Sequence, residues 1–439
     1  SINFTFVDFT IIPESTSRAL GIESTSATTE SWATAAGMSG GEDGDTLINT
    51  GDIGVDATST LTGTSVSIGA EGIPGSLIDL FTEATLADAS PTAAASATGI
   101  SGDGGDDIIL SGGTALATAH ATADAVGVNL SLPLLEQQVD FPSPALAFGG
   151  VGTTAQSQAL GLAGGQGSDT LTNTGDATAT ATSITSGVNV SVSLQGIVDD
   201  ISLFDLQGAV ADGSVAANAL AVGIDGGDGS GTDSGPDTVV STGSATANAD
   251  VTAVSVGFQG SIKQAINLGA ALARTDTAST ATATGIATAD GDDGVTAAGA
   301  ISSTANAYAD TTAVGVEFQG YVKDSASVAA AYIDARTVAD ASSAGIDAGA
   351  GDDSINSGAV TSTVAIADSA AAEVSVTIQG VDQGFGGGVS ITDGETIAES
   401  RARGISGGTG SDTITNSGAL TGSAAATADT TSVDVTLQL

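Results

Sequence analysis

The chain has 439 residues and carries 51 acidic against 7 basic side chains, which gives a net charge of −44. Such a charge repels phosphate backbones and anionic lipids, so composition argues against nucleic acid or membrane insertion as partners. It suits divalent cations or an acidic extracellular surface. Abundant Gly, Ala, Ser and Thr are typical of disordered chains, but an apolar fraction of 41% and only 7 Pro predict a folded protein.

The sequence also indicates where the protein works. It contains no Cys, so disulfides and thiolate metal sites are excluded. It has no run of about 18 apolar residues that could span a membrane. Because the sequence starts at Ser1 with neither Met nor a basic segment, we expect that a signal peptide has been removed. The protein is therefore expected to be extracellular, either secreted or at the cell surface.

Residues 1–36 form the first predicted unit. Ile2, Phe4 and Phe6 alternate with polar residues, which predicts one or two strands in this stretch. The unit precedes the first repeat at the place of a half-coil, and it is a candidate for contact between subunits.

Residues 37–439 consist of seven copies of one repeat. The copies open at Gly37, Gly99, Gly161, Gly223, Gly285, Gly345 and Gly404, at intervals of 62, 62, 62, 62, 60 and 59 residues. A fixed period of this size indicates one stacked repeat architecture rather than separate domains.

Each copy follows one plan. After a turn rich in Gly and Asp, alanine occupies every second place, for example from Ala115 to Ala125, and larger residues then follow one residue out of phase from Val126. Alternation with period two predicts a strand, and the change of phase predicts a bulge or bend. The larger residues end at a second predicted turn, from which a return segment leads to the next copy. This turn is marked by Gln195-Gly196, Gln259-Gly260, Gln319-Gly320 and Gln379-Gly380.

These features predict an all-β fold, a flattened parallel β-solenoid of about seven coils of 62 residues. Two parallel sheets would face each other, thin where Ala meets Ala and thicker where Val, Leu and Phe meet. Equivalent residues of successive coils would lie ~4.8 Å apart and form columns. One column is predicted to hold Leu194, Phe258, Phe318, Ile378 and Leu437. The alternative is a series of antiparallel hairpins in a sandwich, or several small domains.

The Gly/Asp turn contains G-G-x-G-x-D followed by alternating polar and apolar residues. Its clearest copies are Gly164–Asp169 and Gly407–Asp412. The turn resembles the calcium-binding nonapeptide repeat of the RTX (haemolysin-type) family, G-G-x-G-x-D-x-U-x, although the tandem nine-residue spacing of that family is absent. The resemblance implies a Gly-rich turn, a short strand after it, and Asp residues that bind Ca²⁺ between stacked turns.

An Asp stands eight residues after the opening Gly in six copies. The fourth copy has an insertion from Asp228 to Pro236, and its equivalent residue is predicted to be Asp237. The predicted Ca²⁺ ligands are therefore Asp45, Asp107, Asp169, Asp237, Asp293, Asp353 and Asp412. Further candidates from the same turns are Asp43, Asp103, Asp106, Asp228, Asp352, Gly41, Gly165 and Gly408.

The residue types themselves also favour calcium. Glycines permit positive φ values that direct carbonyl groups inward, and Ca²⁺ takes six to eight oxygen ligands. Carboxylates stacked ~5 Å apart repel one another, and none of the 7 Lys and Arg falls in a turn. We therefore expect Ca²⁺ between the turns and folding coupled to its binding. The alternative is that these are tight, solvated turns without metal, above all in the fifth copy, which lacks the Gly pair.

The sequence predicts no enzyme. His120 is the only histidine, so neither a catalytic triad nor a His metal cluster can form. Arg274 and Arg336 are the candidates for the base of a calcium-dependent polysaccharide lyase, which is also a parallel β-helix, but we interpret them as strand or edge charges. Thr rows such as that at 178–182 resemble ice-binding solenoids, but their positions are not kept from copy to copy.

The two ends of the sequence suggest how the molecule assembles. The last copy stops at Leu439 in the middle of a coil, and residues 1–36 occupy the place of a return half-coil. An open solenoid end exposes unpaired backbone groups. We therefore expect head-to-tail self-assembly into a calcium-stabilised extracellular filament or sheath. The alternative is a surface adhesin or spacer module, capped or part of a longer chain, that contacts a cell surface or glycan.

Overall fold

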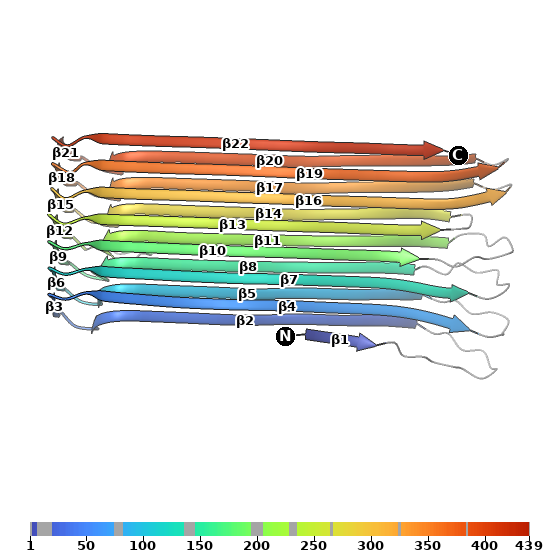
Figure 1. The fold of residues 1–439 in the computed structure, drawn as a ribbon, viewed down its shortest axis with the longest axis horizontal. Coiled ribbons are helices and arrows are strands. Elements are labelled where there is room, and N and C mark those ends of the chain that lie inside the picture. The colour runs from blue at the N-terminus through green and yellow to red at the C-terminus, as the bar shows by residue number, and fades with distance from the viewer. Residues whose placement is uncertain are drawn as a thin grey trace.

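The computed structural model describes residues 2–6, 20–73, 82–135, 145–194, 205–227, 235–263, 267–323, 326–382 and 385–438. These residues form 22 strands in three parallel sheets, and none of them belongs to a helix that could span a membrane. The structure confirms the predicted parallel β-solenoid (Figure 1).

The first sheet, here called the outbound sheet, has eight strands that run away from the Gly/Asp turns. They are β1 (Ile2–Phe6), β4 (Ile53–Ile73), β7 (Ala115–Leu135), β10 (Ala177–Leu194), β13 (Ala245–Lys263), β16 (Ile301–Lys323), β19 (Thr361–Asp382) and β22 (Leu420–Gln438).

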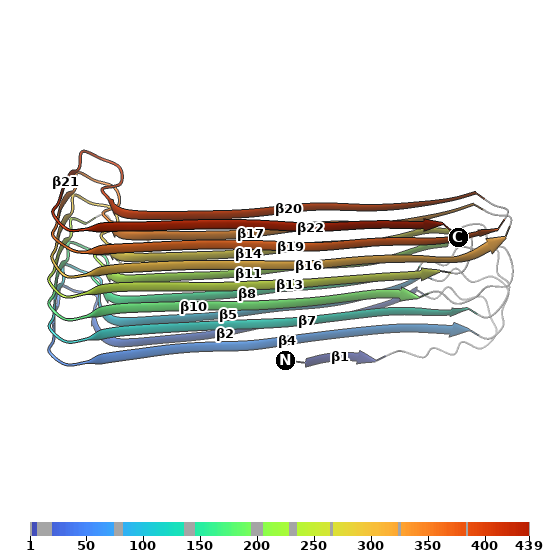
Figure 2. The same cartoon turned by 45° about the horizontal axis from the view of Figure 1, so that its top comes forward.

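The second sheet, the return sheet, brings the chain back. Its strands are β2 (Leu20–Gly41), β5 (Thr82–Asp103), β8 (Ala145–Ala163), β11 (Asp205–Asp225), β14 (Asn267–Ala287), β17 (Ala326–Asp347) and β20 (Phe385–Ser406). The long strands of the two sheets lie in two flat layers (Figure 2).

A third, short sheet lies at the turn edge, and we call it the turn sheet. Its four-residue strands are β3 (Thr46–Asn49), β6 (Ile108–Ser111), β9 (Thr170–Asn173), β12 (Thr238–Ser241), β15 (Gly294–Ala297), β18 (Ser354–Ser357) and β21 (Thr413–Asn416). The two-sheet prediction omitted this layer, although the RTX resemblance implied a short strand after each turn.

The coils stack in register. Each long strand pairs in parallel with its equivalent in the next coil, for example Ala177 with Ala115 on one side and with Ala245 on the other. The predicted first residues of the copies also form one column, because a Cβ on Gly99 would lie 2.4 Å from the carbonyl oxygen of Gly161, and the opening glycines from Gly37 to Gly345 all make this contact with the next copy. The opening residues of successive copies therefore stack in register.

The half of the slab next to the turns is filled as the sequence predicts. Alanines from both long sheets face each other in one large cluster, which includes Ala119, Ala181 and Ala219. At the turn edge, the apolar residues of the first six short strands, from Leu47 to Ile355, are buried in one cluster with residues of the return sheet, as Leu171 and Leu162 illustrate. Small side chains let the two sheets approach closely, and the larger residues close the edge.

The predicted change of phase after the alanines is wrong. Burial alternates without interruption along β7 and β10, and the pairing of these strands has no register shift from Ala177 to Ser193. Since no extra residue enters the ladder, the parity set by the alanines continues to the far end. Val126 and Val128 therefore point outward, and Asn129 points inward.

In the far half of the slab, the outbound sheet consequently turns polar side chains inward and apolar side chains outward, while the return sheet still buries small apolar residues such as Ala147 and Ala209. Buried polar residues there include Ser67, Asn129, Ser191, Gln259, Glu317, Glu373 and Gln379. Hydroxyl groups bridge the two sheets, since Thr311 Oγ1 lies 2.7 Å from the Oγ1 atoms of both Thr277 and Thr337. The prediction that Val, Leu and Phe fill a thick core at this end is therefore wrong.

Two further sequence predictions need correction. The Gln-Gly pairs at 259–260, 319–320 and 379–380 are not turns, because β13, β16 and β19 continue past them to Lys263, Lys323 and Asp382. The pair at 195–196 lies outside the described residues. Phe258 pairs with Val190 and Val314, so the column of Leu194, Phe318, Ile378 and Leu437 contains Ile262 in its place.

Candidate functional site

Seven aspartates, one from each coil, form a single row at the turn edge, which we call the Asp ladder. They are Asp45, Asp107, Asp169, Asp237, Asp293, Asp353 and Asp412. From Asp45 to Asp353, the backbone N–H of each Asp donates a hydrogen bond to Oδ1 of the Asp in the following coil, with N···O distances from 2.6 to 3.1 Å. The structure thus places all seven predicted residues together and confirms that Asp237 is the equivalent in the fourth copy.

The interior members of the Asp ladder are buried. Asp107 is 1% exposed and Asp353 is 2% exposed, and the Oδ2 atom of each has no hydrogen-bond partner. Oδ2 of Asp107 packs against Gly102 of the same coil, where an added Cβ would lie only 2.3 Å away. In most turns the residue five positions before the ladder Asp is glycine, because a Cβ at that position would overlap the Asp carboxylate.

Burial raises the pKa of Asp107 and of Asp353 above the ordinary carboxyl value. Desolvation is the main cause, and it outweighs the backbone hydrogen bond from the preceding coil, which lowers the pKa. Neighbouring carboxylates raise the pKa further, among them Asp45 beside Asp107 and Asp412 beside Asp353. Both groups therefore bind a proton more readily than a solvated Asp does, and a cation near them would oppose this effect.

A second row of acceptors runs beside the Asp ladder in the opposite sense. The carboxylate Oδ1 of Asp106 accepts from the backbone N–H of Ser168 in the following coil at 3.0 Å. Asp292 accepts from Asp352 at 2.9 Å, and Asp352 accepts from Ser411 at 2.8 Å. The candidates Asp106 and Asp352 therefore lie in the turns, but at exposed positions where each accepts a backbone N–H of the following coil. They do not belong to the buried row.

The candidate glycines mark a column of left-handed residues. Gly41, Gly165 and Gly408 have φ values of 115°, 111° and 81°. Asp103 holds the same place in the second coil with φ 74°, and its carboxylate accepts hydrogen bonds from the Ser39 and Ser101 hydroxyls. Asp103 is thus held by local hydroxyls and not by the Asp ladder.

The remaining candidates are less informative. Asp43 lies in the first turn, and Asp228 lies outside the described residues. Within the described ranges, no three His, Cys, Asp or Glu side chains converge as a preformed metal cluster. The mutual repulsion expected from the sequence is not the only interaction of the stacked carboxylates, because Oδ1 of each one from Asp107 to Asp412 also accepts a hydrogen bond from a backbone N–H.

The donor atoms still fit a hard cation. Asp107 and Asp353 each leave a buried Oδ2 without a hydrogen-bond partner, and carboxylate and backbone carbonyl oxygens are the ligands that Ca²⁺ takes. If Ca²⁺ binds, the ladder aspartates would hold it through these second oxygens, and the ion would supply the positive charge that the turns lack.

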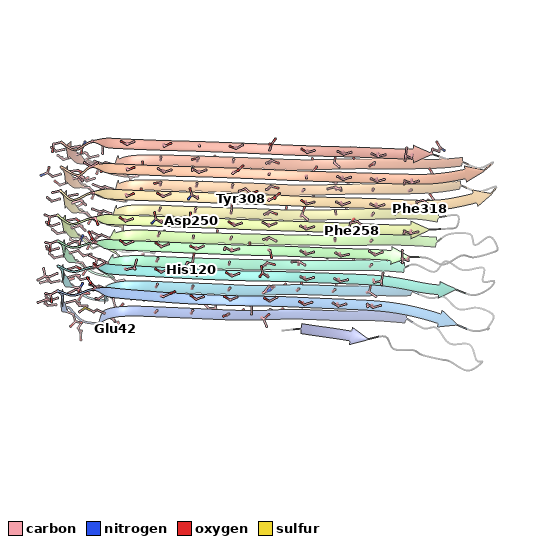
Figure 3. The ribbon with its side chains drawn as sticks, viewed as in Figure 1. Glu42, His120, Asp250, Phe258, Tyr308 and Phe318 are labelled. Carbon is pink, nitrogen blue, oxygen red and sulfur yellow. The ribbon has the colours of Figure 1, made fainter. Side chains whose placement is uncertain are left out.

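The side chains weighed for catalysis lie apart on outer faces. His120 points outward from β7, on the half of the slab near the turns (Figure 3). Arg274 forms an exposed ion pair with Asp276 at 3.2 Å, and Arg336 forms one with Glu395 at 3.0 Å. These contacts give the two arginines surface roles within the outer charge pattern.

Neither a protein-family model, a curated protein nor a solved structure matches this chain. The class of the molecule is therefore defined by its fold and its turns alone. It is a parallel β-solenoid of seven coils with a buried Asp ladder along one edge.

Sequence reasoning missed the buried carboxylates of the far half. Glu373 in β19 is 0% exposed, accepts a hydrogen bond from Ser432 Oγ at 3.0 Å, and leaves Oε1 without a hydrogen-bond partner. Desolvation, and then the charges of Asp393, Asp334 and Asp434, raise its pKa above the ordinary value of 4.5. Ala365 and Ala367 share the parity of Glu373 in β19, but the sequence does not show whether a bulge lies between them.

Replacement of Glu373 by glutamine is expected to stabilise the protein near neutral pH by about 1–3 kcal/mol, because it removes a buried charge with an unmatched oxygen. A carboxyl group whose folded pKa is raised contributes stability below its unfolded pKa, and this contribution is lost as pH rises through the folded pKa. The difference between variant and parent should therefore vanish below about pH 4. Denaturant unfolding of Glu373→Gln over pH 4 to 8 measures it, with exposed Glu395→Gln as the control. Equal stability at pH 8 would contradict it.

Proposed function

We propose that this protein is a structural subunit of a calcium-stabilised extracellular filament, in which successive copies stack end to end. The resemblance of its turns to the RTX repeat, the net charge of −44 and the oxygen-rich Asp ladder support calcium. Six ions between seven coils would reduce the net charge from −44 to −32.

The direction of the Asp ladder supports head-to-tail stacking. Each aspartate gives its N–H to the following coil and offers its carboxylate to the preceding one. Within the described residues, the Asp412 N–H has no following coil and the Asp45 carboxylate has no preceding coil. The N–H of one end and the carboxylate of the other are complementary, so one copy can continue the ladder of the next.

The end strands also match. Tracing the pairing across the outbound sheet places Phe4 and Phe6 of β1 in the same columns as Val433 and Val435 of β22. In the described residues β1 covers β4 only at Thr64–Ile68. We propose that β22 of one copy pairs along the edge of β4 in the next copy and takes the place of β1. In this arrangement, β22 of the first copy and β2 of the next copy together complete one coil.

The variant Asp45→Ala tests this assembly. Its own N–H still donates to Asp107, so the ladder within one chain remains intact, but the acceptor for the next copy is lost. We expect parent filaments in negative-stain microscopy with calcium, dispersal by a chelator, and a rise of about tenfold in the critical concentration for the variant, as one charge-assisted hydrogen bond warrants. Circular dichroism of the variant should equal that of the parent.

Discrete rods in calcium, for parent and variant alike, would reject the filament. They would favour the second candidate function, a surface adhesin or spacer module that displays the solenoid and contacts a cell surface or glycan. The long, flat outer faces in Figure 2 are the feature that favours this alternative.

A further inference from the structure

The outer face of the outbound sheet carries an uncharged stripe over its far half. We define the apolar stripe as two full columns and one shorter column of positions on the outer face, one of which is a glycine. They are Val66, Val128, Val190, Phe258, Val314, Val374 and Val433; Ile68, Leu130, Val192, Gly260, Val316, Val376 and Val435; and Leu194, Ile262, Phe318, Ile378 and Leu437. Phe258 and Phe318 mark it in Figure 3.

The apolar stripe is large enough to be an interface. Side chains in its third column remain well exposed, for example 45% for Ile262, 39% for Phe318 and 47% for Leu437. Columns ~6.8 Å apart along the strands and coils ~4.8 Å apart give it an area of about 600 Å². Isolated soluble proteins rarely expose larger apolar patches, and a stable interface buries about 800 Å² on each partner.

Charge on the opposite face decides between a lipid bilayer and a protein partner. Asn189, beneath the stripe, donates to the backbone carbonyl of Asp212 at 2.9 Å, so Asp212 of the return sheet lies directly behind the stripe. Asp212 is exposed, and its column continues through Arg274 and Asp334. Insertion of the far half into hydrocarbon would bury these charges. In the described part of the far half, only the outer face of the outbound sheet is uncharged. A single uncharged face suits packing against another flat protein surface better than insertion into a bilayer.

We propose that the apolar stripe is a lateral dimer interface, which packs face to face against the stripe of a second copy of this chain. The same columns at the same coil spacing make the stripe self-complementary, as a two-fold interface requires. With the strands of the two copies antiparallel, the acidic turn edges lie at opposite ends, far beyond the Debye length of about 8 Å, and do not repel. The contact uses a surface separate from the filament ends.

Sedimentation velocity of the Asp45→Ala chain, at concentrations below its critical concentration for end-to-end stacking, tests the interface. We expect a species of twice 41.7 kDa, and Val190→Glu with Val316→Glu should raise its dissociation constant at least 100-fold. The matched control places the same charges outward on the same strands, at Thr180→Glu and Thr304→Glu, and should leave the dimer unchanged. The proposal would be overturned if the Asp45→Ala chain without further changes were monomeric at about 100 µM. It would also be overturned if the two pairs of Glu substitutions had equal effects.

Cross-linking between introduced cysteines measures the relative orientation of the two copies. It is specific because the chain has no cysteine of its own. A short bis-maleimide should join two copies of Val192→Cys, at the middle of the stripe, and should not join two copies of Thr178→Cys near the turns. Equal yields from both variants would refute the antiparallel pair. Flotation of the parent with phosphatidylcholine vesicles, abolished by the Glu pair, would replace the dimer with a lipid surface.

Discussion

Replacement of Gly351 by alanine is expected to lower the free energy of unfolding by about 3 kcal/mol or more, because the residue combines a disfavoured backbone conformation with a backbone clash. Its φ is 152°, and an added Cβ would lie 1.7 Å from the carbonyl oxygen of Gly291 in the preceding coil. Gly351 also donates its own N–H to Thr409 at 2.8 Å, so the turn is held from the next coil as well. Denaturant unfolding followed by circular dichroism measures the loss.

Gly358, seven residues further along the same coil, is the matched control. An added Cβ there meets nothing closer than 3.5 Å, and the equivalent place in the preceding coil is Ala298. Gly358→Ala should therefore change stability by no more than about 1 kcal/mol, and in the stabilising direction, because alanine restricts the unfolded chain. Equal losses at the two glycines would show that the turns do not stack as described.

Removal of calcium is expected to have the second large effect. Each Ca²⁺ site held at 100 times its dissociation constant stabilises the folded chain by about 2.7 kcal/mol, so several sites together would make the metal-free chain largely unfolded. Asp169→Asn separates the metal from the hydrogen bond, because Asn Oδ1 can still accept the N–H of Asp107. The variant should lose stability in calcium and be at least as stable as the parent in chelator.

Thermal unfolding in calcium and in chelator, with ion counting by calorimetry, makes this measurement. Asp212→Asn removes the same charge from an exposed position on β11 and should leave the calcium dependence unchanged. A parent whose unfolding ignores the chelator would contradict the calcium proposal. In that case the Asp ladder would act as a hydrogen-bonded spine without metal.

The repeat period and the turns could be predicted from sequence because both depend on positions that every coil shares. The seven opening glycines, with an Asp eight residues later in six of the seven copies, are compatible with one stacking arrangement, and the structure has that arrangement. Asp237 could be found despite an insertion, because the turn around it keeps its order. The hydrogen bond from each N–H to the next carboxylate could not be predicted, since it depends on side-chain direction within the turn.

The filling of the far half could not be predicted for a different reason. In the far half of the outbound strands, Val alternates with Ser and Asn, and alternation alone does not say which set faces inward. The usual preference for burying Val rather than Ser or Asn selects the wrong set. The alanines near the turns fix the parity, and 21 continuous residues of β7 carry it to the other end. Val126 faces out because Ala125 faces in. Only the absence of an inserted residue signals this, and a sequence pattern cannot distinguish it from a bulge.

The in-register columns also make the coil a countable unit of length. Gly223 and Gly285 begin successive copies in one column, so excision of residues 223–284 would bring Asp169 directly before Asp293 with every ladder contact of the same kind. Recombination between copies could therefore shorten or lengthen the molecule in steps of about 4.8 Å without a new junction. The length of such a molecule can therefore evolve by the gain or loss of whole coils, while its cross-section stays the same.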